Sequence, residues 1–241
     1  VVIVRHEELM DAIAAVPFDK LFVGLETPNE DALRTMRKHQ NVKKGDPHYL
    51  ERAVRTLQSK GFEVMGGFIL GLDDDAANPF DPMIESIQKD GIPMAMVSLL
   101  QALKETDLEH RLKREGRLRG DTTGTNFELA LNFVPQMDPA VLIEGYKRVL
   151  DTIYDAKLKN YFERCLTLFE RLDRSRQPKL SMRPPWLSGP RSVLRILRRA
   201  LREIPPAILV SALRFLAIVL VRHPAHLVEA LVFVAKGHHF R

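Results

Sequence analysis

Cysteine is almost absent from this sequence of 241 residues, which contains Cys165 and no other. A single cysteine cannot form a disulfide within the chain, so a disulfide scaffold is excluded. It also cannot by itself hold a zinc ion or an iron–sulfur cluster, because such sites need several ligands. Scarce cysteine is typical of proteins in a reducing compartment, and we expect a cytoplasmic protein.

Long apolar runs are also lacking. The longest, residues 207–221, carries Arg214 near its middle, whereas a membrane-spanning helix needs about 20 predominantly apolar residues. We therefore expect no transmembrane helix. The apolar run at residues 1–4 is followed at once by Arg5, so it is too short for the core of a secretory signal.

The composition is that of a globular protein with an uneven distribution of charge. Apolar residues make up 45% and charged residues 28%, so a sizeable core can be buried. The formal net charge of +5 combines two opposite regions: residues 1–170 contain 22 Lys/Arg and 28 Asp/Glu, and residues 171–241 contain 14 and 3. Such asymmetry indicates two regions in different surroundings, the second suited to phosphate groups on lipid or nucleic acid.

The first 120 residues alternate between strand-like and helix-like segments. Short strands that are apolar throughout and are separated by helices indicate a parallel sheet covered by helices, and hence an α/β fold. The expected strands are residues 1–4, 21–25, 62–71 and 94–100. The expected helices are residues 6–15, 29–37, 47–59, 79–89 and 107–114.

These patterns divide the chain into four parts. Residues 1–120 are expected to form about four parallel βα units, which are too few to close an eight-stranded barrel, so we expect an upstream part to be missing. Residues 121–172 contain a loop and two helices, at 138–154 and 157–172, and residues 173–191 form a proline-rich linker. Residues 192–241 form a basic tail with amphipathic helices at 192–203 and 206–222 and a last helix at 226–236.

Glu26 directly follows one of the predicted strands. In parallel α/β proteins the carboxyl ends of the strands line the ligand crevice, so a carboxylate there can accept hydrogen bonds from a hydroxyl or ammonium group. A carboxylate that binds nearby backbone amides or caps the next helix explains the residue equally well. The position alone leaves both interpretations open.

The strand at residues 62–71 is unusually rich in glycine. Glycine inside a strand loses packing, so it often marks a place where another backbone or a flat ligand such as adenine approaches closely. A bulge at a bend is the structural alternative. The spacing of Gly67 and Gly71 does not match a dinucleotide-binding fingerprint. The following acidic run, Asp73 to Asp75, suits a divalent cation, but solvated or helix-capping carboxylates are commoner in such a loop.

Several of these segments resemble a known family. Residues 23–29, Val-Gly-Leu-Glu-Thr-Pro-Asn, and residues 66–73, Gly-Gly-Phe-Ile-Leu-Gly-Leu-Asp, resemble the second half of a radical S-adenosylmethionine core, specifically that of the cobalamin-binding branch. Later segments resemble the carboxyl-terminal extension of a subgroup that includes the hopanoid C-2 methylases. Those segments are residues 96–102, 131–135, 144–146, 161–165 and 237–240.

The resemblance implies a partial barrel whose strand ends hold S-adenosylmethionine. By matching position, Glu26 would meet the methionyl or ribose part of the cofactor. Gly67, Ile69 and Gly71 would run along the adenine, and Gln101 would lie close by on the next strand.

The sequence departs from the family pattern in three respects. Asp73 or Asp74 stands where many members have glutamate after the glycine strand, and residues 103–106 replace a Pro-Gly-Thr turn beside the adenine. The three closely spaced cysteines that hold the family's four-iron cluster are absent, as is the cobalamin-binding domain. We therefore expect the cluster and cobalamin to belong to the parent protein only, and this chain to be inactive alone.

Two functions are compatible with these observations. The first is a fragment of a radical S-adenosylmethionine enzyme that, with its missing amino-terminal half, transfers a methyl group to an unactivated carbon of a small-molecule or lipid-like substrate. The second is a non-catalytic remnant that binds a partner or an anionic membrane surface through its basic helices.

The basic tail bears on the second function. Arginines recur three or four residues apart in residues 191–202, giving a charged face and an apolar face. Such a helix can lie in a membrane interface, so a peripheral contact at the inner membrane face is expected. Packing of the apolar face on the barrel explains the pattern as well. The tail has no aromatic platform or recognition motif for nucleic acid, so no nucleic-acid partner is expected.

Overall fold

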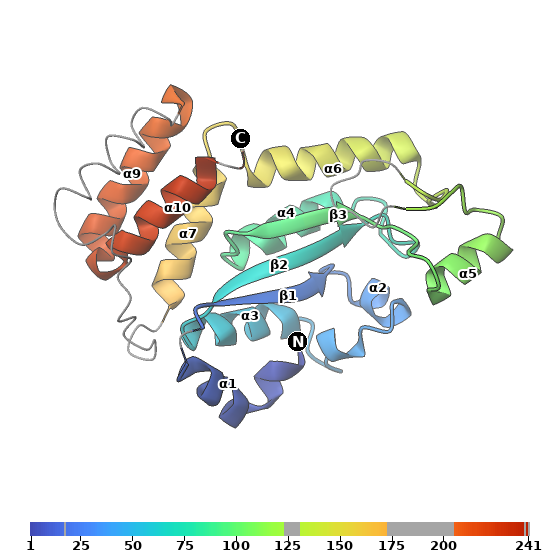
Figure 1. The fold of residues 1–241 in the computed structure, drawn as a ribbon, viewed down its shortest axis with the longest axis horizontal. Helices are drawn as coiled ribbons and strands as arrows, with labels where there is room; N and C mark the ends of the chain where they lie inside the picture. The colour runs from blue at the N-terminus through green and yellow to red at the C-terminus, as the bar shows by residue number, and fades with distance from the viewer. Residues whose placement is uncertain (17, 123–130, 173–204, 239, 241) are drawn as a thin grey trace.

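The structure is a computed structural model that describes the chain except for residues 17, 123–130, 173–204, 239 and 241. A layer of parallel strands lies beside a layer of helices, and a further group of helices packs at one end (Figure 1). The predicted linker at 173–191 and the predicted basic helix at 192–203 lie outside the described residues.

The sheet has three parallel strands in the order β1-β2-β3. The strands are β1 (Lys20–Glu26), β2 (Glu63–Leu70) and β3 (Ala95–Leu99), and they confirm three of the predicted strands. The crossovers carry α2 (Glu30–Thr35), α3 (Tyr49–Ser59) and α4 (Phe80–Lys89). The α/β class with a parallel sheet is therefore confirmed.

The prediction of a first strand at residues 1–4 is wrong. Val2–Arg5 forms a 3-10 helix. The amino group of Val1 donates a hydrogen bond to the side-chain oxygen of Asn41, and the hydroxyl of Tyr49 donates one to the carbonyl of Val1 at 3.3 Å. A strand needs a neighbouring strand to bond with, and here the polar groups of Val1 bond to a loop and a helix instead. Within the described residues, the sheet has three strands rather than four.

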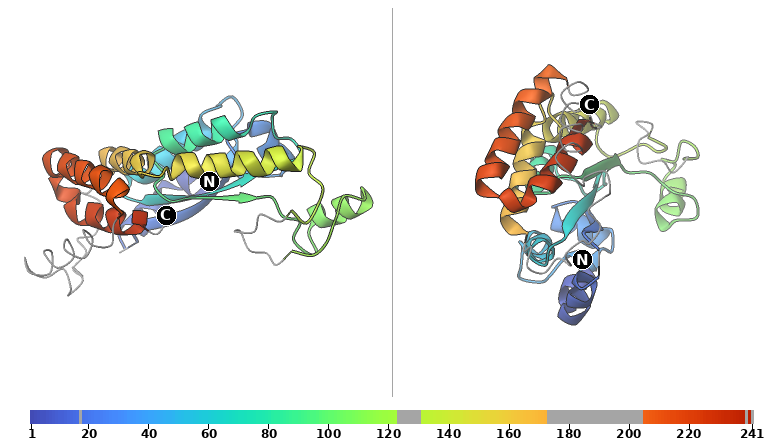
Figure 2. Two further views of the ribbon diagram at one scale, coloured as in Figure 1. Left: turned by 90° about the horizontal axis from the view of Figure 1, so that it is seen from above. Right: turned by 60° about the vertical axis from the view of Figure 1, so that its left-hand side comes forward.

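The two faces of the sheet differ in what covers them. Val64, Phe68 and Leu70 of β2 face α3 and α4 and form one buried core with them. The alternate positions point to the opposite face, where Phe22 of β1 is 58% exposed. Figure 2 shows the helices gathered on one side of the strands. The sheet thus has one covered face and one open face.

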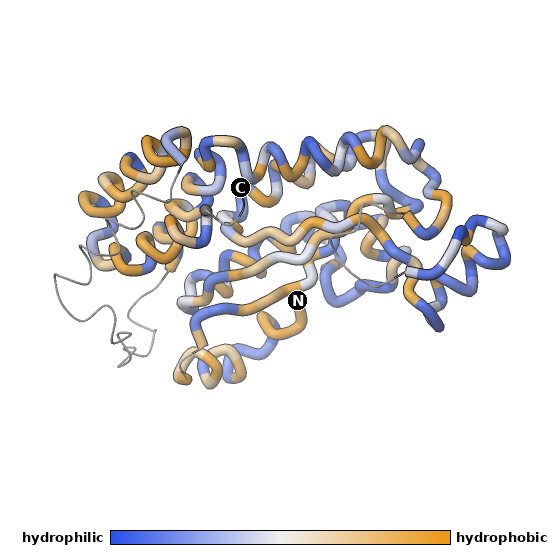
Figure 3. Tube along the Cα trace, turned by 45° about the horizontal axis from the view of Figure 1, so that its top comes forward, coloured by the Kyte–Doolittle hydropathy of each residue, from blue (hydrophilic) through white to orange (hydrophobic). Residues whose placement is uncertain are grey.

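The described part of the carboxyl-terminal half is mostly helical, as predicted. It contains α5 (Asp107–Arg114), α6 (Pro139–Ile153), α7 (Lys159–Arg171), α9 (Pro206–Arg222) and α10 (Leu227–His238). Helix α6 packs along α4 and contacts β3, while α7, α9 and α10 form a group at the end of the sheet where the strands begin (Figure 1). Apolar residues occur along most of α9 (Figure 3). Within the described residues, no helix has the length and apolar content needed to cross a membrane.

Local capping explains where several of these helices begin. The Asn29 side chain accepts hydrogen bonds from the first backbone amides of α2, and Asp138 does the same for α6. Thr106 caps α5 in the same way. Each such cap contributes about 1 kcal/mol to stability.

The family-like segments of the extension pack its helices against one another and against α4. A Cβ on Gly145 of α6 would lie 2.1 Å from the ring of Phe80, so glycine allows α6 to lie directly on α4. The ring of Phe240 stacks on Tyr154 with centroids 4.3 Å apart. Gly237 of α10 leaves room for the ring of Tyr161, 3.0 Å from where a Cβ would stand. These residues therefore contribute to packing between helices.

Candidate functional site

A cavity of about 160 Å³ lies on the open face of the sheet. Gly24 and Gly67 are paired across β1 and β2, and Met96 of β3 is paired with Gly67 on the other side. Because two neighbouring positions lack side chains, this row of the sheet is hollow. The residues that line the cavity are Phe22, Gly24, Glu26, Gly67, Phe68, Ile69, Met96, Val97 and Ser98.

The size of this cavity limits what can enter it. An apolar protein cavity of about 150 Å³ binds benzene. The cavity on the open face therefore has room for a flat ring system, with apolar contacts from Phe22, Ile69 and Met96. A larger ligand would have to extend beyond the three strands.

Glu26 lies at the end of this cavity where β1 ends, and it has an uncommon backbone conformation. Its φ is +69°, and the register between β1 and β2 shifts between Gly24 and Glu26. A non-glycine residue in this region costs about 1–3 kcal/mol, which surrounding contacts must offset. A Cβ on Gly24 would lie 2.6 Å from Oε1 of Glu26, so the glycine makes room for the carboxylate.

Lys38 is the partner of this carboxylate. Its Nζ donates a hydrogen bond to Oε1 of Glu26 at 2.7 Å, and the Glu26 side chain is 11% exposed. The pair places a nearly buried carboxylate on the cavity wall with an ammonium group beside it. Lys38 cannot be recognised from the sequence, because it lies in the connection after α2 and no periodic or motif signal points to it.

Two of the predicted site residues do not line the cavity. Gly71 has φ +89°, and a Cβ there would lie 2.9 Å from Leu142 of α6, on the covered side. The side-chain oxygen of Gln101 accepts a hydrogen bond from the hydroxyl of Thr122. The structure therefore brings Glu26, Gly67 and Ile69 together, and the roles of Gly71 and Gln101 along the adenine stay predictions.

Two carboxylates of the acidic run after β2 accept hydrogen bonds that stabilise the loop in which they lie. Asp73 accepts hydrogen bonds from Arg117 at 2.6 Å and from Arg111 at 2.8 Å, and the bond with Arg117 lowers the pKa of Asp73. Asp75 accepts from the backbone amides of Gly71 and Leu72. Among the described residues, no group of three His, Cys, Asp or Glu side chains is arranged to hold a metal ion.

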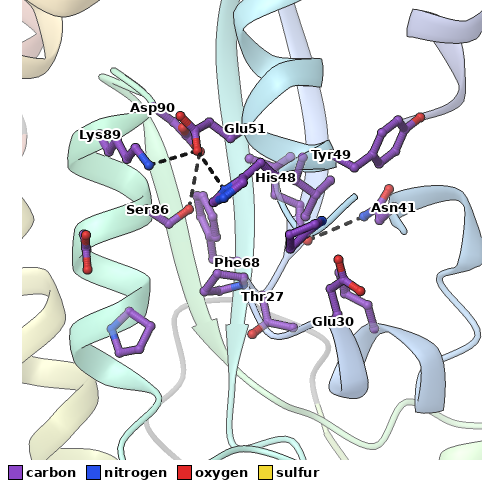
Figure 4. A pocket seen from close by; sticks show the side chains of 17 residues that line it. Thr27, Glu30, Asn41, His48, Tyr49, Glu51, Phe68, Ser86, Lys89 and Asp90 are labelled. Atoms are coloured by element: carbon purple, nitrogen blue, oxygen red, sulfur yellow. Dashed lines mark hydrogen bonds and ion pairs between the residues drawn. The ribbon is translucent and has the colours of Figure 1, made fainter. Parts of the chain in front are cut away.

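A second cavity, of about 190 Å³, lies on the helix side of the sheet between α3 and α4. Phe68 lies at its base, and charged side chains stand around it (Figure 4). Glu51 forms an ion pair with Lys89 at 3.0 Å, and its other close neighbour is Nδ1 of His48 at 3.4 Å. The sequence analysis missed this cavity, because its walls come from helices that meet only in the fold.

Asp90, beside this second cavity, makes stability depend on pH. It is buried and accepts a hydrogen bond from Ser86 at 3.3 Å, and burial, followed by the charge of Glu51, raises the pKa of Asp90 to about 6. Because the pKa of Asp90 is higher in the folded state than in the unfolded state, the protonated carboxyl contributes fully to the free energy of unfolding below about pH 4. This contribution is lost as the pH rises through 6. We expect Asp90→Asn to stabilise the protein by about 1–3 kcal/mol near pH 8 and by nothing near pH 4.

Urea unfolding at the two pH values measures this difference. The control is Glu144→Gln, which changes an exposed carboxylate of α6 and should shift the unfolding free energy alike at both pH values. An Asp90→Asn variant that is less stable than the wild type near pH 8 would contradict the prediction.

The fold and the cavity define a parallel α/β protein with a ligand-sized hollow on the open face of its sheet. Residues 106–241 match the model of a family described as a domain of unknown function, DUF4070. Because this match covers more than half of the chain, the chain belongs to that family. No solved structure matches it.

Two curated relatives extend the comparison. An uncharacterized methyltransferase of Synechocystis sp. is 32% identical over 167 residues, which cover 69% of this chain and 30% of the relative. The hopanoid C-2 methylase of Rhodopseudomonas palustris is 35% identical over 161 residues, which cover 66% of this chain and 29% of the relative. The chain thus spans less than a third of the length of either relative. These matches confirm the resemblance to the cobalamin-binding radical S-adenosylmethionine subgroup that includes the hopanoid C-2 methylases.

Proposed function

We propose that this chain supplies the carboxyl-terminal half of the S-adenosylmethionine site of a radical methyltransferase. The observation that carries the proposal is the meeting of Glu26, Gly67 and Ile69 at one cavity on the open face of the sheet. Both curated relatives are named as methyl-transferring enzymes, which supports the reaction class. The longer protein would transfer a methyl group to an unactivated carbon of a small-molecule or lipid-like substrate.

The sheet has features of a barrel segment. Its strands follow one another in chain order, and the helices of the crossovers pack on a single face. In a closed or partial βα barrel the helices lie outside and the opposite face of the sheet lines the interior. We propose that the open face is such an interior, completed by strands of the longer protein.

Each residue of the cavity has a role in this proposal. S-adenosylmethionine carries a sulfonium centre, which is the source of its chemistry. Glu26 accepts hydrogen bonds from the ammonium group or the ribose hydroxyls, and Lys38 keeps the carboxylate in place. The glycine pair at 24 and 67 forms a flat floor for the adenine, and Ile69 shields the ring from water.

The residues present do not fit an iron–sulfur cluster. Cys165 is fully buried in α7, and burial raises the pKa of its thiol, whereas the thiolate is the form that binds iron. We propose that the cluster and cobalamin bind to other parts of the longer protein.

Methyl-labelled protein provides a test that needs no catalysis. We expect S-adenosylmethionine to shift the NMR methyl signals of Ile69 and Met96, which line the cavity. The signals of Met83 and Ile92, which are buried elsewhere in the core, should stay in place. Glu26→Gln should weaken the titration about tenfold or more, because a hydrogen bond to a charged group contributes about 1.5–3 kcal/mol.

Glu30→Gln is the matched control for Glu26→Gln. Glu30 lines the second cavity rather than the first, so this variant should titrate like the wild type. Shifts that spread equally to Met83 and Ile92, or an affinity unchanged in Glu26→Gln, would argue against the site.

A further inference from the structure

The outward face of α9 is apolar and exposed. Val210 is 72% exposed, Leu213 50%, Leu220 59% and Val221 81%. At about 100° per residue these four positions fall within one arc of roughly 100° on the helix surface. The opposite side of α9, with Ile208, Ala212, Phe215 and Val219, is buried against the rest of the protein.

Such a helix needs a second apolar environment. A helix that is apolar all round is normally buried on every side or lies in a membrane. Helix α9 has 17 residues, and no described helix meets the requirements for crossing a membrane. Lying in the plane of an interface therefore suits its outward face better than spanning does.

The charges on α9 indicate what kind of surface its apolar arc would bind. Arg214 is exposed and borders the apolar arc, about 20° beyond Val221 on the helix surface, whereas Arg222, also exposed, lies near the buried side at the end of the helix. The helix contains no Asp or Glu, and residues 171–241 as a whole contain 14 Lys/Arg against 3 Asp/Glu. A cation at the edge of an apolar arc is the arrangement by which interfacial helices bind anionic lipid head groups.

A second copy of the chain suits this face less well. A two-fold dimer places the same patch against itself. In an antiparallel pair of α9 helices, Arg214 of both copies would lie at the same edge of the contact, and α9 has no carboxylate to compensate them. A lipid surface supplies both the apolar contact and the negative charge.

We propose that the outward face of α9 docks on an anionic membrane surface with the helix axis in the membrane plane. Helix α9 lies at the end of the molecule opposite the carboxyl ends of the strands (Figure 1). Docking there leaves the cavity on the open face of the sheet free. The proposal is independent of the proposed function, because none of the α9 residues lines that cavity.

Vesicle flotation of the full 241-residue chain tests the proposal. The wild type should float with vesicles of equal parts phosphatidylglycerol and phosphatidylcholine and not with phosphatidylcholine alone. Replacing Val210, Leu213 and Val221 together by serine should abolish flotation. Arg214→Gln should weaken binding about fivefold, because a basic residue near an anionic surface contributes about 1 kcal/mol, and Arg222→Gln should weaken it less, because Arg222 points away from the arc.

Matched controls lie at the other end of the molecule. Val141 of α6 is 49% exposed, and Val141→Ser should float like the wild type. Lys113→Gln and Arg114→Gln remove exposed charges from α5 and should leave flotation unchanged. Circular dichroism checks that every variant is folded.

Three results would overturn the proposal. The first is a wild type that does not bind the anionic vesicles, as expected if another part of the chain covers α9. The second is a serine variant that floats as well as the wild type. The third is a wild-type dimer in solution that the serine substitutions convert to a monomer, which would assign the face to a second copy.

Discussion

Replacing Arg164 with methionine is expected to destabilise the protein by about 2–5 kcal/mol, because each buried acceptor left without a donor costs about 1–3 kcal/mol, and this is a large part of the total stability of a domain. Arg164 is completely buried. Its guanidinium donates hydrogen bonds to the carbonyls of Ile92 at 2.8 Å and Ile153 at 2.7 Å and to the side-chain oxygen of Gln88, and it stands 5.2 Å from the ring centroid of Tyr154. Methionine has similar length but donates nothing, so buried carbonyls lose their partners.

Urea unfolding followed by circular dichroism measures this loss. Arg114→Met, at the exposed end of α5, is the control for the change of residue type and should alter the unfolding free energy by less than about 0.5 kcal/mol. An unfolding free energy of Arg164→Met within about 1 kcal/mol of the wild-type value would mean that the carbonyls find other partners. The hydrogen bonds from Arg164 would then not be needed for stability.

The elements with strong local signals could be predicted from sequence. Asp138 followed by Pro139 marks the start of α6, and the Asn29 cap marks the start of α2, because capping depends on neighbours in the chain. The strand around Gly67 could be placed for a similar reason, since it lies between two helices with clear ends. Such signals are local and do not depend on the rest of the fold.

Residues 1–4 show that local signals do not suffice to predict a strand. They have the β-branched composition of a strand, yet a strand forms only where a partner strand offers an edge. The contacts of Val1 with Asn41 and Tyr49 join positions 40 and 48 residues apart in the sequence, and no local pattern predicts them. The number of strands was therefore overestimated by one.

The candidate site was predictable in part for the same physical reason. The carboxyl ends of neighbouring parallel strands meet, so Glu26 and the β2 glycines could be expected at one edge of the sheet. Lys38 could not be foreseen, because its contact with Glu26 depends on the path of the chain after α2. Nor could Gly67 be distinguished from Gly71, because strand alternation puts both on one face, whereas β2 ends at Leu70 and Gly71 adopts a φ of +89° beyond it.

That difference between the two glycines leads to the prediction with the largest expected effect on binding. A Cβ at position 67 would meet the tip of the Phe22 ring at 3.1 Å, and this ring is mostly exposed and free to turn aside. We expect Gly67→Val to fold with a stability within about 1 kcal/mol of the wild type, because valine favours strands. Its side chain fills the cavity, so the affinity for S-adenosylmethionine should fall by about a hundredfold or more.

Gly71→Val is the matched variant, with the same chemical change four residues along the chain. Here φ is +89° and a Cβ would stand 2.9 Å from Leu142, so we expect a loss of about 2–4 kcal/mol in unfolding free energy. Urea unfolding and the methyl-labelled titration separate the two effects: one variant keeps its stability and loses the ligand, and the other loses stability. If Gly67→Val still binds with wild-type affinity, the glycine floor is not where the adenine lies, whatever the fold of the sheet.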